Sequence, residues 1–185
     1  INNAYANVAS SFFSAKFQNH IEELLIAPIP NYLILAGYVM GGVARGLLVG
    51  IIVTIVALFF TKLHVQHLFI TLSMVILSAV LFSLGGFINA IYGKSFDHIA
   101  IMPTFVLTPL TYLGGSLYSI KLLPEFWQQA SLFNPILYMV NAFRYGILGV
   151  SDIPVGFAFG IIMLFIVGLA SFALYLLNRG TGLRH

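Results

Sequence analysis

The stretch YLILAGYVMGGVARGLLVGIIVTIVALFF, from Tyr32 to Phe60, decides the class of protein to which this chain belongs. It is long enough to cross the hydrocarbon core of a bilayer as a helix, and its single charged side chain is Arg45. The whole chain has the same bias, because 60% of its residues are hydrophobic and only 7% are charged. Globular proteins have about 25% charged residues. The sequence therefore predicts an integral membrane protein.

Further apolar segments of similar length follow this stretch. A helix needs about 20 residues to cross a hydrocarbon core of about 30 Å. Four segments reach that length, at 32–60, 68–92, 99–118 and 155–177. The third contains Pro103 and Pro109, which remove backbone hydrogen bonds, so we expect that helix to be kinked or opened. The predicted fold class is all-α, a polytopic bundle of transmembrane helices.

The residues ahead of Asn31 follow a different pattern, in which apolar and polar positions alternate at helical spacing. The apolar positions recur at steps of four, four and three, as Phe13, Phe17, Ile21 and Leu24. Lysine, glutamate and amide side chains lie between them, and two prolines, Pro28 and Pro30, end the pattern. Residues 12–30 are therefore expected to form an amphipathic surface helix.

A second amphipathic stretch, NPILYMVNAFRYGILG, runs from Asn134 to Gly149. Its apolar positions are Ile136, Val140, Phe143 and Ile147, and its polar face carries Asn134, Tyr138, Asn141 and Tyr145. At 1.5 Å per residue this helix is roughly 24 Å long, which is short for a span. We expect residues 124–149 to form re-entrant or interfacial helices on the outer side of the membrane.

Charge distribution gives a narrow preference for the orientation of the spans. Alternating ends place one set of basic residues on the same side, namely Lys16, Lys94, Arg179 and Arg184. This side is favoured as cytoplasmic by the excess of Lys and Arg. The tail at 178–185 is then cytoplasmic.

Polar groups inside the spans each have two interpretations. Arg45 is either a snorkelling arginine near an interface, or a group that pairs at the mouth of a pathway. The third span contains the hydroxyls of Thr104, Thr108, Thr111, Tyr112, Ser116 and Tyr118. They either line a route for an amphipathic substrate, or satisfy backbone groups that the prolines free.

Glycines in the first span form overlapping rows of small residues. The rows consist of Gly37 with Gly41, and of Gly42 with Gly46 and Gly50. Such rows let another helix approach closely, so packing is their expected role.

The chain has no pattern typical of a catalytic or metal site. It has no Cys, no P-loop and no GxSxG, and its carboxylates lie at span ends or in loops. His64 and His67 have HxxH spacing without a nearby carboxylate, so they are expected to be solvated. The scattered basic residues give no support for nucleic-acid binding. We therefore expect no enzyme, metal or cofactor in this chain, and energy for any uphill transport must come from outside it.

Two segments resemble the membrane permease subunits of ABC-2 type exporters. KFQNHIEELLIAPIP, residues 16–30, resembles the cytoplasmic coupling segment between the second and third spans of that family. FNPILYMVNAFRYGILG, residues 133–149, is similar to the short re-entrant helices before the last span. Family members usually have six spans. The resemblance therefore implies that the chain is N-terminally truncated, with residues 1–11 as the end of a span, in agreement with a start that lacks Met and a signal pattern.

The resemblance also implies a function and a set of partners. Such permeases lie in the bacterial inner membrane and pair as homodimers, and each copy binds a separate ATPase subunit that holds ATP and Mg. The chain is then an exporter subunit whose coupling helix docks in a groove of the ATPase and moves the first complete span through the Pro28 to Pro30 junction. The alternative is a membrane scaffold or assembly subunit that transports nothing.

Candidate site residues follow from both lines of reasoning. For ATPase coupling they are Phe13, Phe17, Ile21, Glu22, Glu23, Leu24, Leu25 and Pro28. For a pathway or gate they are Arg45, Pro109, Tyr112, Asn134, Asn141, Arg144 and Tyr145. Arg144 has a structural alternative, in which it pairs with Glu125 or Asp152 at the interface.

Overall fold

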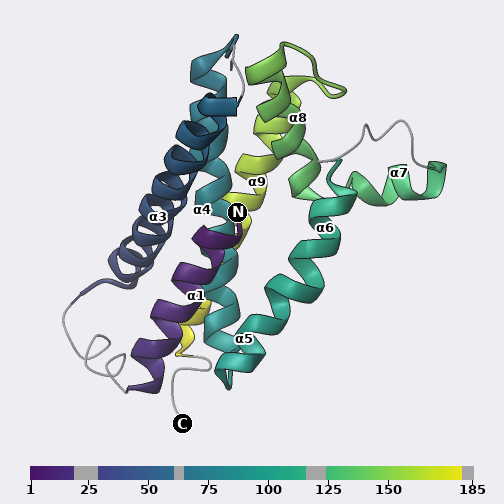
Figure 1. Cartoon of the computed structure of the whole chain (residues 1–185). Coiled ribbons are helices and arrows are strands. Elements are labelled where there is room, and N and C mark those ends of the chain that lie inside the picture. The colour runs from purple at the N-terminus through teal and green to yellow at the C-terminus, as the bar shows by residue number, and fades with distance from the viewer. Residues whose placement is uncertain (19–28, 61–64, 116–123, 181–185) are drawn as a thin grey trace.

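The chain folds as a bundle of helices, shown in Figure 1 as a computed structural model that describes residues 1–18, 29–60, 65–115 and 124–180. Within these ranges the regular elements are all helices, so the predicted all-α class is confirmed. The longer helices are α1 (Asn2–Phe17), α3 (Asn31–Phe60), α4 (Leu68–Tyr92), α8 (Pro135–Leu148) and α9 (Val155–Arg179). The shorter elements are α5 (Phe96–Met102), the π-helical turn η1 (Pro103–Leu107), α6 (Thr108–Leu113) and α7 (Glu125–Ser131).

Among the described helices, α3, α4 and α9 are long and apolar enough to cross a membrane. Many of their exposed side chains are large and apolar, and Phe59, Phe60 and Phe69 are each at least 84% exposed. Exposed apolar surface of this extent is unfavourable in water but is covered by acyl chains in a bilayer. We call the end of the bundle where α1 and α9 finish the lower end, and the opposite end the upper end (Figure 1).

Helix α4 lies at the centre of the bundle. It contacts α1, α3, α5, α8 and α9. Helix α1 approaches it closely because Gly86 has no side chain: a Cβ atom there would lie 3.1 Å from the carbonyl carbon of Tyr5. Three rings, one each from α1, α3 and α4, fill the space below this crossing. The ring of Phe12 lies 5.1 Å from Tyr38 and 4.3 Å from Phe87, which joins the three helices through edge and tilted aromatic contacts.

The segment expected as a span at 99–118 is helical but irregular. Helices α5 and α6 are joined by η1, which begins at Pro103. Proline lacks an N–H and clashes with the carbonyl four residues earlier, so the regular ladder of backbone hydrogen bonds cannot continue. The N–H of Thr108 bonds instead to the carbonyl of Pro103, five residues earlier, which is the pattern of a π-helix. The predicted opening of this helix therefore takes the form of a π turn. Residues 116–118 lie outside the described residues.

The start of the amphipathic helix, expected at residue 12, is not a helix boundary. Helix α1 continues without a break to Phe17, and Phe12 and Phe13 are almost completely buried. The physical reason is that both rings pack on neighbouring helices, so this part of the pattern belongs to the core of the bundle. The remainder of the expected helix, residues 19–28, lies outside the described residues.

Candidate functional site

One face of α1 is buried and the other is polar. The buried face consists of Ala4, Tyr5, Val8, Ala9, Phe12 and Phe13. The opposite face, which we call the α1 polar face, consists of Asn3, Asn7, Ser10, Ser11 and Ser14. These five residues recur at steps of three and four, so they share one side of the helix, and none of them is buried. Polar side chains that point away from the protein in a membrane helix are typical of a surface that faces water or another polypeptide.

An open groove of about 360 Å³ runs between α1 and α3. Asn7 and Ser11 of the α1 polar face form one wall, and α3 forms the other with Leu33, Gly37, Tyr38 and Gly41 among its residues. Both glycines leave space, since no atom lies within 4 Å of a Cβ built at either position. The groove therefore combines an amide and hydroxyls with an apolar floor.

Arg45 lies on α3 one turn beyond this groove. It follows Gly41 by four residues and therefore shares its face of the helix. It is about 21 Å from the first residue of α3, at 1.5 Å per residue, so it lies about halfway along this helix of 30 residues. The side chain is exposed, with no hydrogen-bond or ion-pair partner within the described part of the chain. Helix α3 is longer than the hydrocarbon core of about 30 Å, so both interpretations of Arg45, snorkelling near an interface and pairing at the mouth of a pathway, stay open.

The hydroxyls of the irregular helix are bonded to its own backbone. The hydroxyls of Thr104, Thr108 and Thr111 donate to carbonyls four or five residues earlier, at 3.0, 3.2 and 2.7 Å. The accepting carbonyls belong to Ala100, Pro103 and Leu107, whereas each proline frees the carbonyl four residues before it, so both interpretations of these hydroxyls stay open. Pro109 is the second residue of α6 and is exposed, and Tyr112 is 54% exposed on the same short helix.

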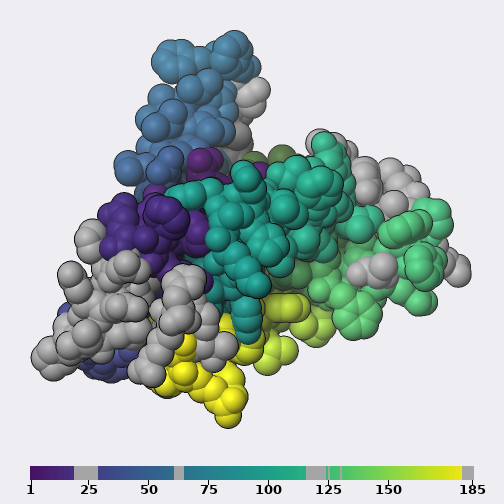
Figure 2. Space-filling model, turned by 90° about the horizontal axis from the view of Figure 1, so that it is seen from below, coloured from purple at the N-terminus to yellow at the C-terminus, as the bar shows by residue number. Residues whose placement is uncertain are grey.

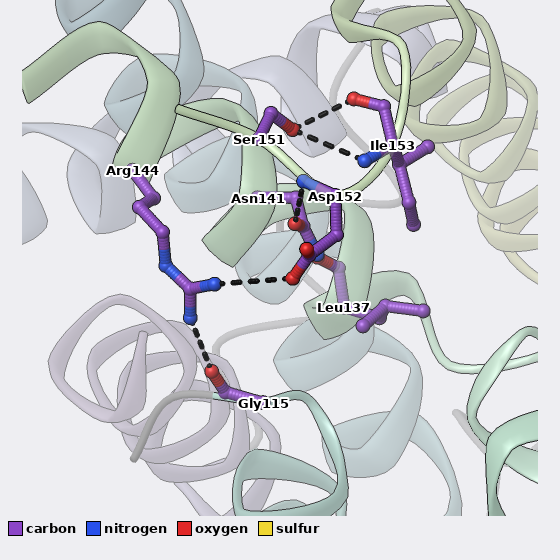
Figure 3. Close-up of polar contacts among 7 residues, drawn as sticks. All are labelled: Gly115, Leu137, Asn141, Arg144, Ser151, Asp152 and Ile153. Atoms are coloured by element: carbon purple, nitrogen blue, oxygen red, sulfur yellow. Dashed lines mark hydrogen bonds and ion pairs between the residues drawn. The ribbon is translucent and has the colours of Figure 1, made fainter. Parts of the chain in front are cut away.

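Arg144 of α8 joins two turns of the chain, as Figure 3 shows. Its Nη2 atom donates to the carbonyl of Gly115 after α6 at 2.8 Å, and its Nη1 atom lies 3.4 Å from a carboxylate oxygen of Asp152 before α9. Of the two carboxylates considered as partners, the structure therefore pairs Arg144 with Asp152. Asn141 supports the same turn, because its side-chain oxygen accepts a hydrogen bond from the backbone N–H of Asp152 at 3.1 Å.

The other polar residues of α8 also bond within the chain. Asn134 caps the helix by accepting from the N–H of Ile136 at 3.0 Å, and its amide donates to the carbonyl of Leu110 in α6 at 2.6 Å. The Tyr145 ring stacks on His67, with ring centres 5.0 Å apart and planes 8° from parallel. Asn134, Asn141, Arg144 and Tyr145 thus hold α8 against its neighbours.

Comparison with known proteins identifies the family. The profile of the ABC-2 type transporter family matches residues 1–148. The chain belongs to the ABC-2 type transporter family. It is 58% identical to the inner membrane transport permease YadH of Escherichia coli K12 over 185 residues, which is all of this chain and 72% of YadH. It is 23% identical to nodulation protein J of Rhizobium leguminosarum over 163 residues, 88% of this chain and 63% of that protein. No solved structure matches the chain significantly.

Two of the residues that the ABC-2 resemblance assigns to ATPase coupling lie within the described residues. Phe13 is 3% exposed and packs against Phe96 with ring centres 4.8 Å apart, so its ring is already occupied within this chain. Phe17, at the end of α1, is 72% exposed. The other six residues fall in the segment outside the described residues: Ile21, Glu22, Glu23, Leu24, Leu25 and Pro28.

The glycines of α3 divide into packed and open positions. A Cβ atom at Gly42 would clash with the Ser83 hydroxyl and lie 2.5 Å from Val8, and one at Gly46 would lie 3.2 Å from Ala4. These two glycines therefore let α1 and α4 approach α3, while Gly50 has nothing within 4 Å.

No metal site emerges from the part of the chain that the structure describes, where no group of three or more His, Asp and Glu side chains could hold an ion. His67 is engaged with Tyr145, and His64 lies outside the described residues.

Sequence reasoning about this ABC-2 protein missed the α1 polar face. The signal was present, because Asn3, Asn7 and Ser14 recur at helical steps between apolar residues. The resemblance implies only that residues 1–11 are the end of a span, and it does not say in which direction their polar side points.

Proposed function

We propose that this chain is the membrane-spanning permease subunit of an ATP-binding cassette exporter, with ATP hydrolysed by a separate subunit. The α1 polar face carries the proposal. A row of amides and hydroxyls on a membrane helix is costly against lipid and favourable beside water, so it suits the wall of a substrate pathway. The relative YadH is named an inner membrane transport permease, and we place this chain in the same membrane.

A second copy of the chain would complete the pathway. A single copy leaves the α1 polar face and the groove beside it open on its surface. Two copies related by a two-fold axis would bring two such faces together around water. Each copy would bind an ATPase subunit through the segment that contains Glu22 and Glu23.

The walls of the groove suit an amphipathic substrate. Its α3 side is apolar, its α1 side presents an amide and a hydroxyl, and Arg45 adds a positive charge one turn beyond. Pro109 and Tyr112 belong to the outer half of the same route, and the contacts of Asn134, Asn141, Arg144 and Tyr145 support its exit.

The experiment uses cysteine accessibility, because the chain contains no native cysteine and the substrate does not need to be known. Asn7→Cys and Ser11→Cys are made in the full-length permease and treated with a charged, membrane-impermeant thiol reagent. Leu164→Cys on α9, where the native side chain is 69% exposed on an apolar surface, is the matched control. The reagent needs thiolate and therefore water, so we expect at least tenfold faster modification at the two α1 positions.

Nucleotide dependence separates an exporter from a scaffold. The modification rates of Asn7→Cys and Ser11→Cys should change at least threefold when ATP is added to permease purified with its ATPase subunit. Rates as slow as that of Leu164→Cys would overturn the pathway assignment. Fast but nucleotide-independent modification, without a co-purifying ATPase, would favour the membrane scaffold.

A further inference from the structure

The lower end of α1 holds the last turn of α4. The Lys16 ammonium group donates to the carbonyl of Ile91 at 2.8 Å and to that of Gly93 at 3.2 Å. The last carbonyls of a helix lack N–H partners within the helix and carry its negative dipole end, so a lysine there is doubly favourable. Lys16 thus attaches α1 to the point where the chain leaves α4.

The same end of α1 holds the first residue of α5. The Phe96 ring lies edge-on to Phe13 at 4.8 Å and 6.2 Å from the ring of Phe17. Figure 2, which views the molecule from below, shows the purple surface of α1 beside the teal surface of the α5 region. We call Phe13, Lys16 and Phe96 together the lower clasp.

Helix α5 is also attached to α4. The Asn89 amide donates to the carbonyl of Ile99 at 3.1 Å. Gly93 approaches Ile99 so closely that a Cβ at Gly93 would lie 2.9 Å from its side chain. The beginning of α5 is therefore attached to the end of α4 through Asn89 and Gly93 as well as to the end of α1 through Phe13.

The upper end of the same irregular helix is fixed elsewhere. Asn134 donates to the carbonyl of Leu110, and Arg144 donates to that of Gly115, which ties α6 to α8. Between the two attachments lies η1, where the regular hydrogen-bond ladder is interrupted at Pro103. Such interruptions are where helices bend. The irregular helix from Phe96 to Leu113 is thus attached to its neighbours at both ends, and its hydrogen-bond ladder is interrupted between them at η1.

We propose that the lower clasp transmits movement of the lower end of α1 to α5, so that this helix bends at η1. Lys16 is the positioning residue of this device, and the inference rests on the proposed function, since ATPase closure supplies the movement. The ABC-2 resemblance implies a route through Pro28 and Pro30 into α3, and that route stays a prediction. The clasp adds a second route, to the helix that carries Tyr112.

The test measures a distance across the bundle in the full-length permease bound to its ATPase subunit, in lipid nanodiscs. Spin labels at Ala100→Cys on α5 and Leu164→Cys on α9, both at exposed positions, report the position of α5. Residues 1–185 contain no cysteine, and any cysteine elsewhere in the complex is first replaced by serine. We expect ATP with vanadate to shift this distance in the unmodified background. Lys16→Met keeps the length of the side chain but removes the donor, and should reduce the shift at least threefold.

Conservative and matched variants distinguish positioning from a general loss of structure. Lys16→Arg should retain the shift because it still donates, and Lys94→Met, at an exposed lysine, should retain it too. Phe96 is 52% exposed, so Phe96→Ala should reduce the shift in distance without unfolding the protein. Phe126→Ala on α7, at a position that is 73% exposed, should leave the shift unchanged. If Lys16→Met fails to assemble, the comparison of Phe96→Ala with Phe126→Ala still tests the proposal.

Two negative results have different meanings. A normal nucleotide response in both Lys16→Met and Phe96→Ala would overturn this inference and leave the proposed function standing. A protein that binds no ATPase and shows no nucleotide response in the unmodified background would overturn the proposed function, and the transmission inferred from it.

Discussion

Helices α8 and α1 both carry polar residues at helical spacing, but they turn these residues in opposite directions. In α8, Asn134 and Asn141 are at most 3% exposed and bond to the backbone of neighbouring segments. In α1, Asn3 and Ser11 belong to a face that points away from the bundle. The same kinds of side chain therefore support the fold in one helix and remain available in the other.

This difference shows how polar residues in a membrane protein should be interpreted. Inward polar groups must find partners, because an unpaired group in a low-dielectric interior costs free energy. The outward polar residues of α1 lie on a face that is not buried, where the Ser10 hydroxyl donates to the carbonyl of Asn7 in the same helix, so water or another molecule can reach them. The substitutions below test whether the two helices differ in this way, and they are ordered by expected effect.

Arg144→Met should cause the largest loss of stability. It removes a charged hydrogen bond to Gly115 and the ion pair with Asp152, which together join the turn after α6 to the turn before α9. Both side chains are partly exposed, at 25% and 16%, so solvent weakens the pair. We expect a loss of about 2 to 3 kcal/mol in the free energy of unfolding, measured by titration with SDS in mixed micelles.

Arg144→Lys is the matched variant. It keeps the positive charge but lacks the fork that reaches Gly115 and Asp152 at once, so we expect about half of that loss. A full-length protein as stable with methionine as with arginine would show that these turns do not depend on the guanidinium, and would remove the main support for a fixed upper end.

One substitution made in both helices gives the sharpest comparison. Asn141→Leu leaves the N–H of Asp152 without its side-chain acceptor and should cost about 1 to 2 kcal/mol of unfolding free energy. Asn7→Leu changes an outward residue of α1 and should stay within about 0.5 kcal/mol. Both are measured by the same SDS titration. Equal losses at the two positions would mean that the α1 polar face is also structural, against its assignment to a pathway.

The overall fold was largely predictable from the sequence. Runs such as Tyr32 to Phe60 have one stable solution in a bilayer, because a helix satisfies its own backbone. Pro103 and Pro109 also predict that the helical hydrogen bonds of the third segment are interrupted, although the sequence does not say that the interruption is a π turn.

The contacts of the candidate site were less predictable, because they depend on which helices meet. Spacing could not choose between Glu125 and Asp152 as the partner of Arg144, since both are near in sequence and only the fold decides. The spacing of Phe13 also fits an amphipathic surface helix, and only the fold shows that Phe96, from a segment distant in sequence, packs against its ring. The coupling role of Glu22 and Glu23 stays a prediction.

Ser83→Ala should have the smallest effect, and with the opposite sign. Ser83 lies on α4 against Gly42 of α3, and its hydroxyl is buried without a hydrogen-bond partner in the part of the chain that the structure describes. It is therefore an inward polar group that, unlike those of α8, lacks compensation. Replacing it with alanine removes the cost of burying the hydroxyl and leaves only a small gap, so we expect a gain of about 0.5 to 1 kcal/mol in the SDS titration.

Ser78→Ala, at a half-buried position of the same helix, should change stability by less than about 0.5 kcal/mol. A clear loss at Ser83 alone would mean that its hydroxyl donates within the membrane, for example to the carbonyl one turn back, and that even this residue follows the rule that inward polar groups in this bundle are paired.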